Sequence, residues 1–93
     1  MKKTKNHVST SVGRKIKEIR KSNGISGNDL AKKLGLTQQQ ISRYESGQSV
    51  MSIDTVVMIA HVLHVSVNEL LSDYLASEYS DIMILMSHRN TDK

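Results

Sequence analysis

Four polar side chains recur at intervals of three and four residues: Gln38, Gln39, Ser42 and Arg43. On a helix this spacing places them on one face. A glutamine amide matches the hydrogen-bonding groups of adenine N6 and N7, and an arginine guanidinium matches guanine O6 and N7. The same side chains would also suit an ordinary solvated helix face, because glutamine is common on protein surfaces. The residues alone leave base reading and a plain polar surface as open interpretations.

Helix-start and helix-stop signals surround this polar row. Ser26 stands three residues before Asp29, and Thr37 stands three residues before Gln40. This is the spacing of a capping box, in which a hydroxyl and a second side chain each bond a backbone amide near the helix start. Gly35 lies between the two boxes and suits the left-handed conformation that ends many helices. The pattern predicts two short helices joined by a tight turn.

The two predicted helices run over about 27–34 and 38–46. Each has apolar residues at helical spacing, which form an inward stripe. The stripe residues are Leu30, Ala31, Leu34, Ile41 and Tyr44. Because the alanine is small, the two helices are expected to cross closely.

Three further helices are predicted around this pair. One runs over 12–22, with Ser11 as its cap. Another runs over 53–63 and is apolar nearly all round, so it is expected at the centre of the core. A fifth helix follows the capping-box residue Ser66 and is expected to reach about Asp73, and residues 74–79 could prolong it.

These residues carry a resemblance to a known family. Residues 12–71 resemble the phage repressor and Cro-like helix-turn-helix family (XRE type), since turn, caps, apolar stripe and polar face match together. Residues 36–47 are similar to that family's recognition helix almost residue for residue. The resemblance implies an all-α fold, a five-helix repressor-like helix-turn-helix domain with a short C-terminal extension. More loosely, residues 13–45 resemble small regulators encoded with bacterial fimbrial operons, which repress motility.

The resemblance also implies roles for individual positions. Base reading is expected from Gln38, Gln39, Ser42 and Arg43. Contacts with the DNA backbone are expected from Arg14, Lys15, Gly27, Asn28, Thr37, Gln40, Gln48 and Ser49. Arg20 and Glu45 are expected to form a structural pair that joins the first helix to the recognition helix. The family commonly has a polar side chain at the position of Gly27, so here only backbone amides could meet a phosphate.

The distribution of charge points in the same direction. The net charge of the 93 residues is +4, but residues 1–50 hold eleven Lys or Arg against three Asp or Glu, whereas residues 51–93 hold two against six. The basic half contains the predicted helix pair, as expected if that surface meets phosphate. A charge run is more often only a solvated face. Taken together with the family resemblance, the basic half makes double-stranded DNA the expected partner.

Other kinds of chemistry find little support in the residues. The chain has no cysteine, which excludes disulfides and suits a reducing cytoplasm. His61 and His64 stand three apart, but no further ligand completes a metal site, and His64 is expected at a helix C-cap. We expect no enzyme, metal, cofactor or small-molecule effector, because no Gly-rich phosphate loop or carboxylate pair is evident. No apolar run could span a bilayer, so a cytoplasmic protein without membrane contact is expected.

The two ends of the chain are expected to differ from the middle. Residues 1–10 are predicted to form a flexible basic arm, which could lie along a DNA groove or act only as a solubilising tail. Residues 11–73 are predicted to form the helix-turn-helix DNA-binding domain. Residues 74–93 are predicted to form a C-terminal extension and dimerisation segment.

An apolar run in this extension has no place in a five-helix core. Its members are Ile82, Met83, Ile84, Leu85 and Met86. A homodimer contact through this run would set two recognition helices one DNA turn apart, on a palindromic operator. The run could instead fold back over its own domain, or bind another protein if the chain is an antitoxin or interaction module. The sequence leaves these alternatives open.

Overall fold

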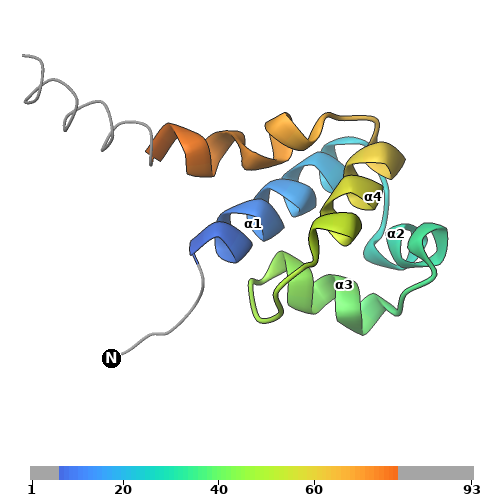
Figure 1. The fold of residues 1–93 in the computed structure, drawn as a ribbon. Coiled ribbons are helices and arrows are strands. Elements are labelled where there is room, and N and C mark those ends of the chain that lie inside the picture. The colour runs from blue at the N-terminus through green and yellow to red at the C-terminus, as the bar shows by residue number, and fades with distance from the viewer. Residues whose placement is uncertain (1–6, 78–93) are drawn as a thin grey trace, which may run out of the picture.

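Five helices make up residues 7–77, the part of the chain that the computed structural model describes (Figure 1). They are α1 (His7–Ser22), α2 (Gly27–Leu34), α3 (Gln38–Glu45), α4 (Ile53–Leu63) and a fifth helix described over Val67–Ser77. No strand occurs within this described range. The all-α prediction is confirmed.

The core collects the apolar stripes of all five helices. Its buried side chains are Val12, Ile16, Leu30, Ala31, Ile41, Val56, Ile59, Ala60, Leu63 and Leu70. The predicted stripe of α2 and α3 is confirmed, because three of its members are buried and Leu34 and Tyr44 are half-buried against them. Burial of each Val, Leu or Ile side chain contributes roughly 1.5–3 kcal/mol relative to exposure.

The caps predicted at Ser26, Thr37 and Ser66 form through their hydroxyl groups, whereas Ser11 lies inside α1. Ser26 Oγ accepts from Asp29 N at 2.9 Å, and Ser66 Oγ accepts from Glu69 N at 3.0 Å. Gly35 ends α2 with a φ of 70°, the left-handed conformation for which glycine was expected there. Local sequence therefore determines where the short helices begin and end.

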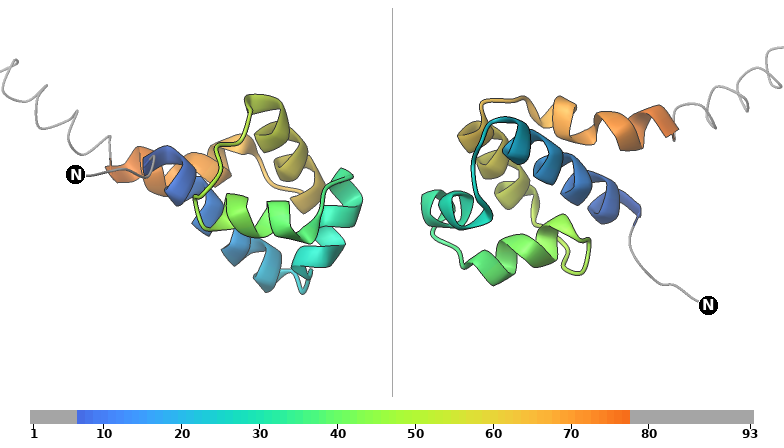
Figure 2. Two further views of the ribbon diagram at one scale, coloured as in Figure 1. Left: turned by 90° about the horizontal axis from the view of Figure 1, so that it is seen from below. Right: turned by 180° about the vertical axis from the view of Figure 1, so that it is seen from behind.

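The bounds of two helices differ from the first estimate made from their caps. α1 begins at His7 rather than after Ser11, and it adds Val8 to the apolar stripe of Val12. The fifth helix continues past Asp73 to at least Ser77. The physical reason is tertiary, since α1 and the fifth helix lie side by side and extend each other's packing surface (Figures 1 and 2).

The face of α4 is also less buried than its composition predicts. Ile53 is 70% exposed, and Val57 and Met58 are about half exposed. Helices α1 and α2 and the fifth helix cover only one side of α4, so the opposite side keeps its apolar residues at the surface.

His64 ends α4 in the left-handed conformation, with φ 60° and ψ 40°. An L-residue pays roughly 1–2 kcal/mol to adopt this conformation. We therefore expect His64→Gly to raise the free energy of unfolding by about 1 kcal/mol, after the entropy of glycine is subtracted. Urea denaturation would measure the change. His61→Gly, at an exposed position inside α4, is the control and should lower stability by about the same amount.

The fifth helix runs along α1 in the opposite direction, so its described C-terminal end lies near the N-terminal end of α1 (Figures 1 and 2). Helix α3 lies on the other side of the domain.

Among the described residues no single helix is long and apolar enough to cross a membrane. Helix α4 and the fifth helix pass that test of length and composition only as a pair, and this pair is bent by 115°.

Candidate nucleic-acid interface

The outer face of α3 carries the polar row that the sequence singles out. Gln38, Gln39, Ser42 and Arg43 are all exposed, whereas Ile41 on the opposite face is 1% exposed. Two primary amides, a hydroxyl and a guanidinium thus point away from the core on one short helix. This set offers donors and acceptors in the combination that base edges require.

The start of α3 is held by a complete capping box. Gln40 N donates to Thr37 Oγ1 at 3.1 Å, and Thr37 N donates to Gln40 Oε1 at 3.0 Å. The box therefore occupies the Thr37 amide and the oxygen of Gln40 in building the helix. The backbone N–H groups of Gln38 and Gln39 are left as donors in the first turn, at the positive end of the helix dipole.

The N-terminus of α2 lies beside that of α3. A Cβ atom added to Gly27 would lie 3.8 Å from Gln38 Cγ and 3.9 Å from Arg20 Cζ. Asn28 follows in the first turn and is exposed. Because helix N-termini attract anions, this pair of adjacent termini suits one stretch of phosphate backbone.

A buried ion pair fixes α3 against α1. Arg20 Nε donates to Glu45 Oε2 at 2.7 Å, and Nη2 donates to Oε1 at 2.9 Å, so the contact is bidentate. Arg20 Nη1 also donates to the Ile25 carbonyl at 2.9 Å. The hydrogen bonds that Arg20 donates to Glu45 raise the pKa of Arg20 above its usual value. The guanidinium therefore stays charged, and the geometry matches the structural role predicted for the pair.

A close backbone contact, which the sequence reasoning missed, supports this ion pair. A Cβ atom on Gly13 of α1 would overlap the Tyr44 carbonyl oxygen and come within 2.9 Å of the Glu45 carbonyl oxygen. Only a residue without a side chain lets α1 approach the C-terminal end of α3 this closely. The available signal was a glycine inside a helical pattern, which costs helix stability unless packing requires it.

The basic residues of α1 separate into two faces. Lys15 Nζ lies 3.5 Å from Asp73 of the fifth helix and 3.9 Å from Glu18, so its ammonium group is already paired. It stands two residues from Gly13, about 200° round the helix and therefore away from α3. Lys17 stands four residues from Gly13, on the α3 side, and is exposed. Lys17 joins the exposed Arg14 as a candidate for phosphate contact.

The loop after α3 adds neutral groups to the same end of the domain. The amides of Gln48 and Ser49 both donate to the Arg43 carbonyl, at 2.9 and 3.3 Å, and close the turn. Their side chains remain exposed and half-buried, respectively. Any phosphate contact from this loop would therefore come from an amide or hydroxyl side chain, without a charge.

Most of the predicted site residues therefore fall into three groups. The polar row of α3 and the two helix N-termini form one surface. Arg20 and Glu45 lie behind it as a structural pair. Lys15 belongs to the contact between α1 and the fifth helix. The predicted dimer residues 82–86 and the arm residues 1–6 lie outside the described residues.

Comparison with known proteins identifies the architecture. The helix-turn-helix family model matches residues 16–70. The regulator SinR of Bacillus subtilis is 36% identical over 69 residues, which are 73% of this chain and 62% of SinR. A putative helix-turn-helix regulatory protein of Pyrococcus furiosus is 32% identical over 50 residues, which are 54% of this chain. The chain spans only 16% of the length of that archaeal protein.

Solved structures show the same fold. The clp gene regulator ClgR of Corynebacterium glutamicum superposes with a TM-score of 0.72 at 21% identity, covering 77% of this chain and 94% of ClgR. The restriction-modification controller protein C.AhdI of Aeromonas hydrophila gives a TM-score of 0.63 at 28% identity, over 66% of this chain and 92% of C.AhdI. Hydroxypropylphosphonic acid epoxidase of S. wedmorenis matches over only 34% of its own length, so the likeness does not extend to the whole enzyme.

Proposed function

Because the chain belongs to the XRE-type helix-turn-helix family of transcriptional regulators, we propose that it is a sequence-specific DNA-binding protein. It reads a palindromic operator through α3 in the major groove, acts in the cytoplasm, and performs no catalysis. The observation that carries this proposal is the exposed row of Gln38, Gln39, Ser42 and Arg43 on a helix whose N-terminus lies beside that of α2. The row supplies base contacts, and the paired N-termini supply phosphate contacts.

The proposal includes a homodimer. A single α3 of eight residues reads few base pairs, and a two-fold dimer would place a second copy about 34 Å away on the same face of DNA. Light scattering on the full chain at micromolar concentration should give the mass of two chains, and replacing Met83 and Leu85 together by serine should give the mass of one. A single-chain mass without the substitutions contradicts the dimer.

Selection of bound sequences from a random DNA library, repeated at two salt concentrations, tests the function. We expect a palindromic motif whose half-sites lie one helical turn apart. The same motif should be recovered at the higher salt concentration. Recovery of no motif, with binding that vanishes at the higher salt, would show that the basic surface has only generic affinity. The chain would then act as a protein-interaction module such as an antitoxin, an alternative that the exposed apolar face of α4 favours.

The roles of individual residues are separable on the selected operator. Arg43→Ala should relax preference at one base position by about 1–3 kcal/mol, because a bidentate base contact is lost. Arg14→Ala should weaken all sequences alike, since a phosphate contact carries no sequence information. Binding of both variants to a library of single-base operator changes measures the difference. A uniform loss with Arg43→Ala would contradict the assignment.

Gly27 gives a test in which binding should improve. Its Cβ position is bordered only at 3.8 Å or more, so a side chain fits without moving the backbone. Gly27→Gln should add a phosphate contact at the start of α2 and tighten binding by about 0.5–1.5 kcal/mol. Gly27→Ala is the control, because it makes the same backbone change without an amide. Equal affinity of the two variants would show that no phosphate lies within reach of α2.

A further inference from the structure

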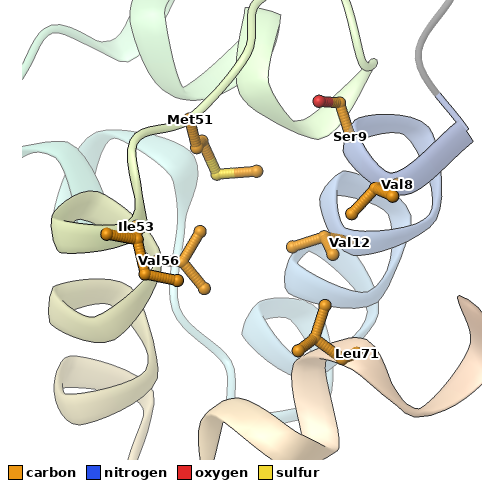
Figure 3. A pocket seen from close by; sticks show the side chains of 7 residues that line it. All are labelled: Val8, Ser9, Val12, Met51, Ile53, Val56 and Leu71. Carbon is orange, nitrogen blue, oxygen red and sulfur yellow. The ribbon is translucent and has the colours of Figure 1, made fainter. Parts of the chain in front are cut away.

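An open apolar pocket lies on a part of the surface that the proposed DNA contacts do not use. It has a volume of about 210 Å³ and lies between the first half of α1, the start of α4 and the fifth helix (Figure 3). Six apolar side chains line it: Val8, Val12, Met51, Ile53, Val56 and Leu71. Ser9 adds a hydroxyl. An apolar cavity of about 150 Å³ is already large enough to bind benzene, so this pocket has room for aliphatic side chains.

The apolar surface continues beyond the pocket along α4. Ile53 lies at its edge and is 70% exposed. Val50 stands three residues before it and is 72% exposed, and Val57, one turn later on the same side of the helix, is 50% exposed. Pocket and patch together are an exposed apolar area of the kind that marks an interaction surface.

The position of the chain's end points to what covers this surface. The C-terminal end of the fifth helix, as far as it is described, lies near the N-terminal end of α1, whose Val8 and Val12 line the pocket (Figures 1 and 3). The apolar run at 82–86 follows after four intervening residues. An extended chain covers at most ~3.3–3.6 Å per residue, so five steps from Ser77 reach about 17 Å. The run is thus tethered close to the face that contains the pocket.

We propose that the pocket receives residues 82–86 of a second copy of this chain. The proposal rests on the homodimer proposed above and assigns its contact surface. Five residues can fill the pocket as far as Ile53 at its edge but cannot also cover Val50 and Val57. A second copy packed about a two-fold axis brings a tail for the pocket and an equivalent α4 face for the patch. In a reciprocal exchange, each copy supplies both the segment and the pocket that receives the partner's segment.

The exchange leaves the proposed DNA surface uncovered. The pocket draws on α1, the segment 51–56 and the fifth helix, whereas the polar row lies on α3, which contributes no residue to the pocket lining. Both copies could therefore hold their tails and present α3 at the same time.

Disulfide mapping tests the exchange, because the full chain has no cysteine of its own. One chain carries Leu85→Cys, and a second chain with a mass tag carries Ile53→Cys. The control partner carries Met58→Cys, which is similarly exposed but lies on another side of α4. After mixing and mild oxidation, we expect the Ile53→Cys chain to form the mixed disulfide at least about a hundredfold faster than the Met58→Cys chain, since docking raises the local concentration. Equal rates would overturn the proposal.

The double variant Ile53→Cys with Leu85→Cys separates exchange from folding back. A covalent dimer on a non-reducing gel supports exchange, whereas a cross-linked single chain shows that the tail occupies its own pocket and overturns it. The DNA selection is run on the same preparations. A palindromic motif without the mixed disulfide would overturn this inference and leave the proposed function standing. Formation of the mixed disulfide without any selected motif would support the exchange and overturn the proposed function.

Discussion

Replacing Arg20 by alanine should destabilise the domain by about 3–5 kcal/mol, because it leaves the Glu45 carboxylate buried without its partner. The side chains of Arg20 and Glu45 are only 10% and 7% exposed, and two short hydrogen bonds join them. A third bond from Arg20 to the Ile25 carbonyl would be lost as well. Urea denaturation of Arg20→Ala against the unchanged chain measures the effect.

Two further variants show whether charge or geometry matters. Arg20→Lys keeps the charge but cannot make the bidentate contact, so it should recover only part of the loss. Replacing both members by apolar residues, as Arg20→Met with Glu45→Leu, should recover more, because no charge is then buried alone. If Arg20→Ala costs less than about 1 kcal/mol, the pair behaves as a surface salt bridge and does not fix α3.

The contribution of Arg20 should not depend on pH in the neutral to alkaline range. Hydrogen bonding to Glu45 raises the pKa of Arg20. A raised pKa means that its stabilisation is complete below the ordinary arginine pKa and is lost only as pH rises through the higher folded value. The stability difference between the unchanged chain and Arg20→Ala should therefore be the same at neutral and at moderately alkaline pH.

Gly13→Ala is expected to have the second large effect. The added methyl would overlap the carbonyl oxygen of Tyr44 and press on that of Glu45, both of which are backbone atoms that cannot rotate away. Helix α1 and the end of α3 would have to separate, at a cost of about 1–3 kcal/mol or more. Since α3 would shift on α1, operator affinity should fall together with thermal stability.

The matched control for Gly13 is Gly27→Ala. Both glycines lie in helices, but the nearest atom to a Cβ at Gly27 is 3.8 Å away. Alanine there should be neutral or should raise stability by up to about 1 kcal/mol, through helix propensity. Equal stability of the two variants would show that α1 and α3 can make room for the added methyl group without a cost in stability. The ion pair between Arg20 and Glu45 would then have to hold the two helices alone.

Local sequence determined most of the helix boundaries. Ser26, Thr37 and Ser52 cap the helices that follow them, and Gly35 ends α2, because a cap needs only groups within about three residues. The exposed row on α3 was predictable for the same reason, since its members and the buried Ile41 share one short helical period. Whether the row reads bases stays a prediction.

Tertiary structure decided what depends on neighbours distant in the chain. The extent of α1, the exposure of Ile53 and the pairing of Lys15 with Asp73 each depend on where the fifth helix and α4 lie. The need for Gly13 appears only when α1 meets the end of α3. Helical periodicity states which residues share a face, but only the packed helices determine which faces are covered and which surface is left for a partner.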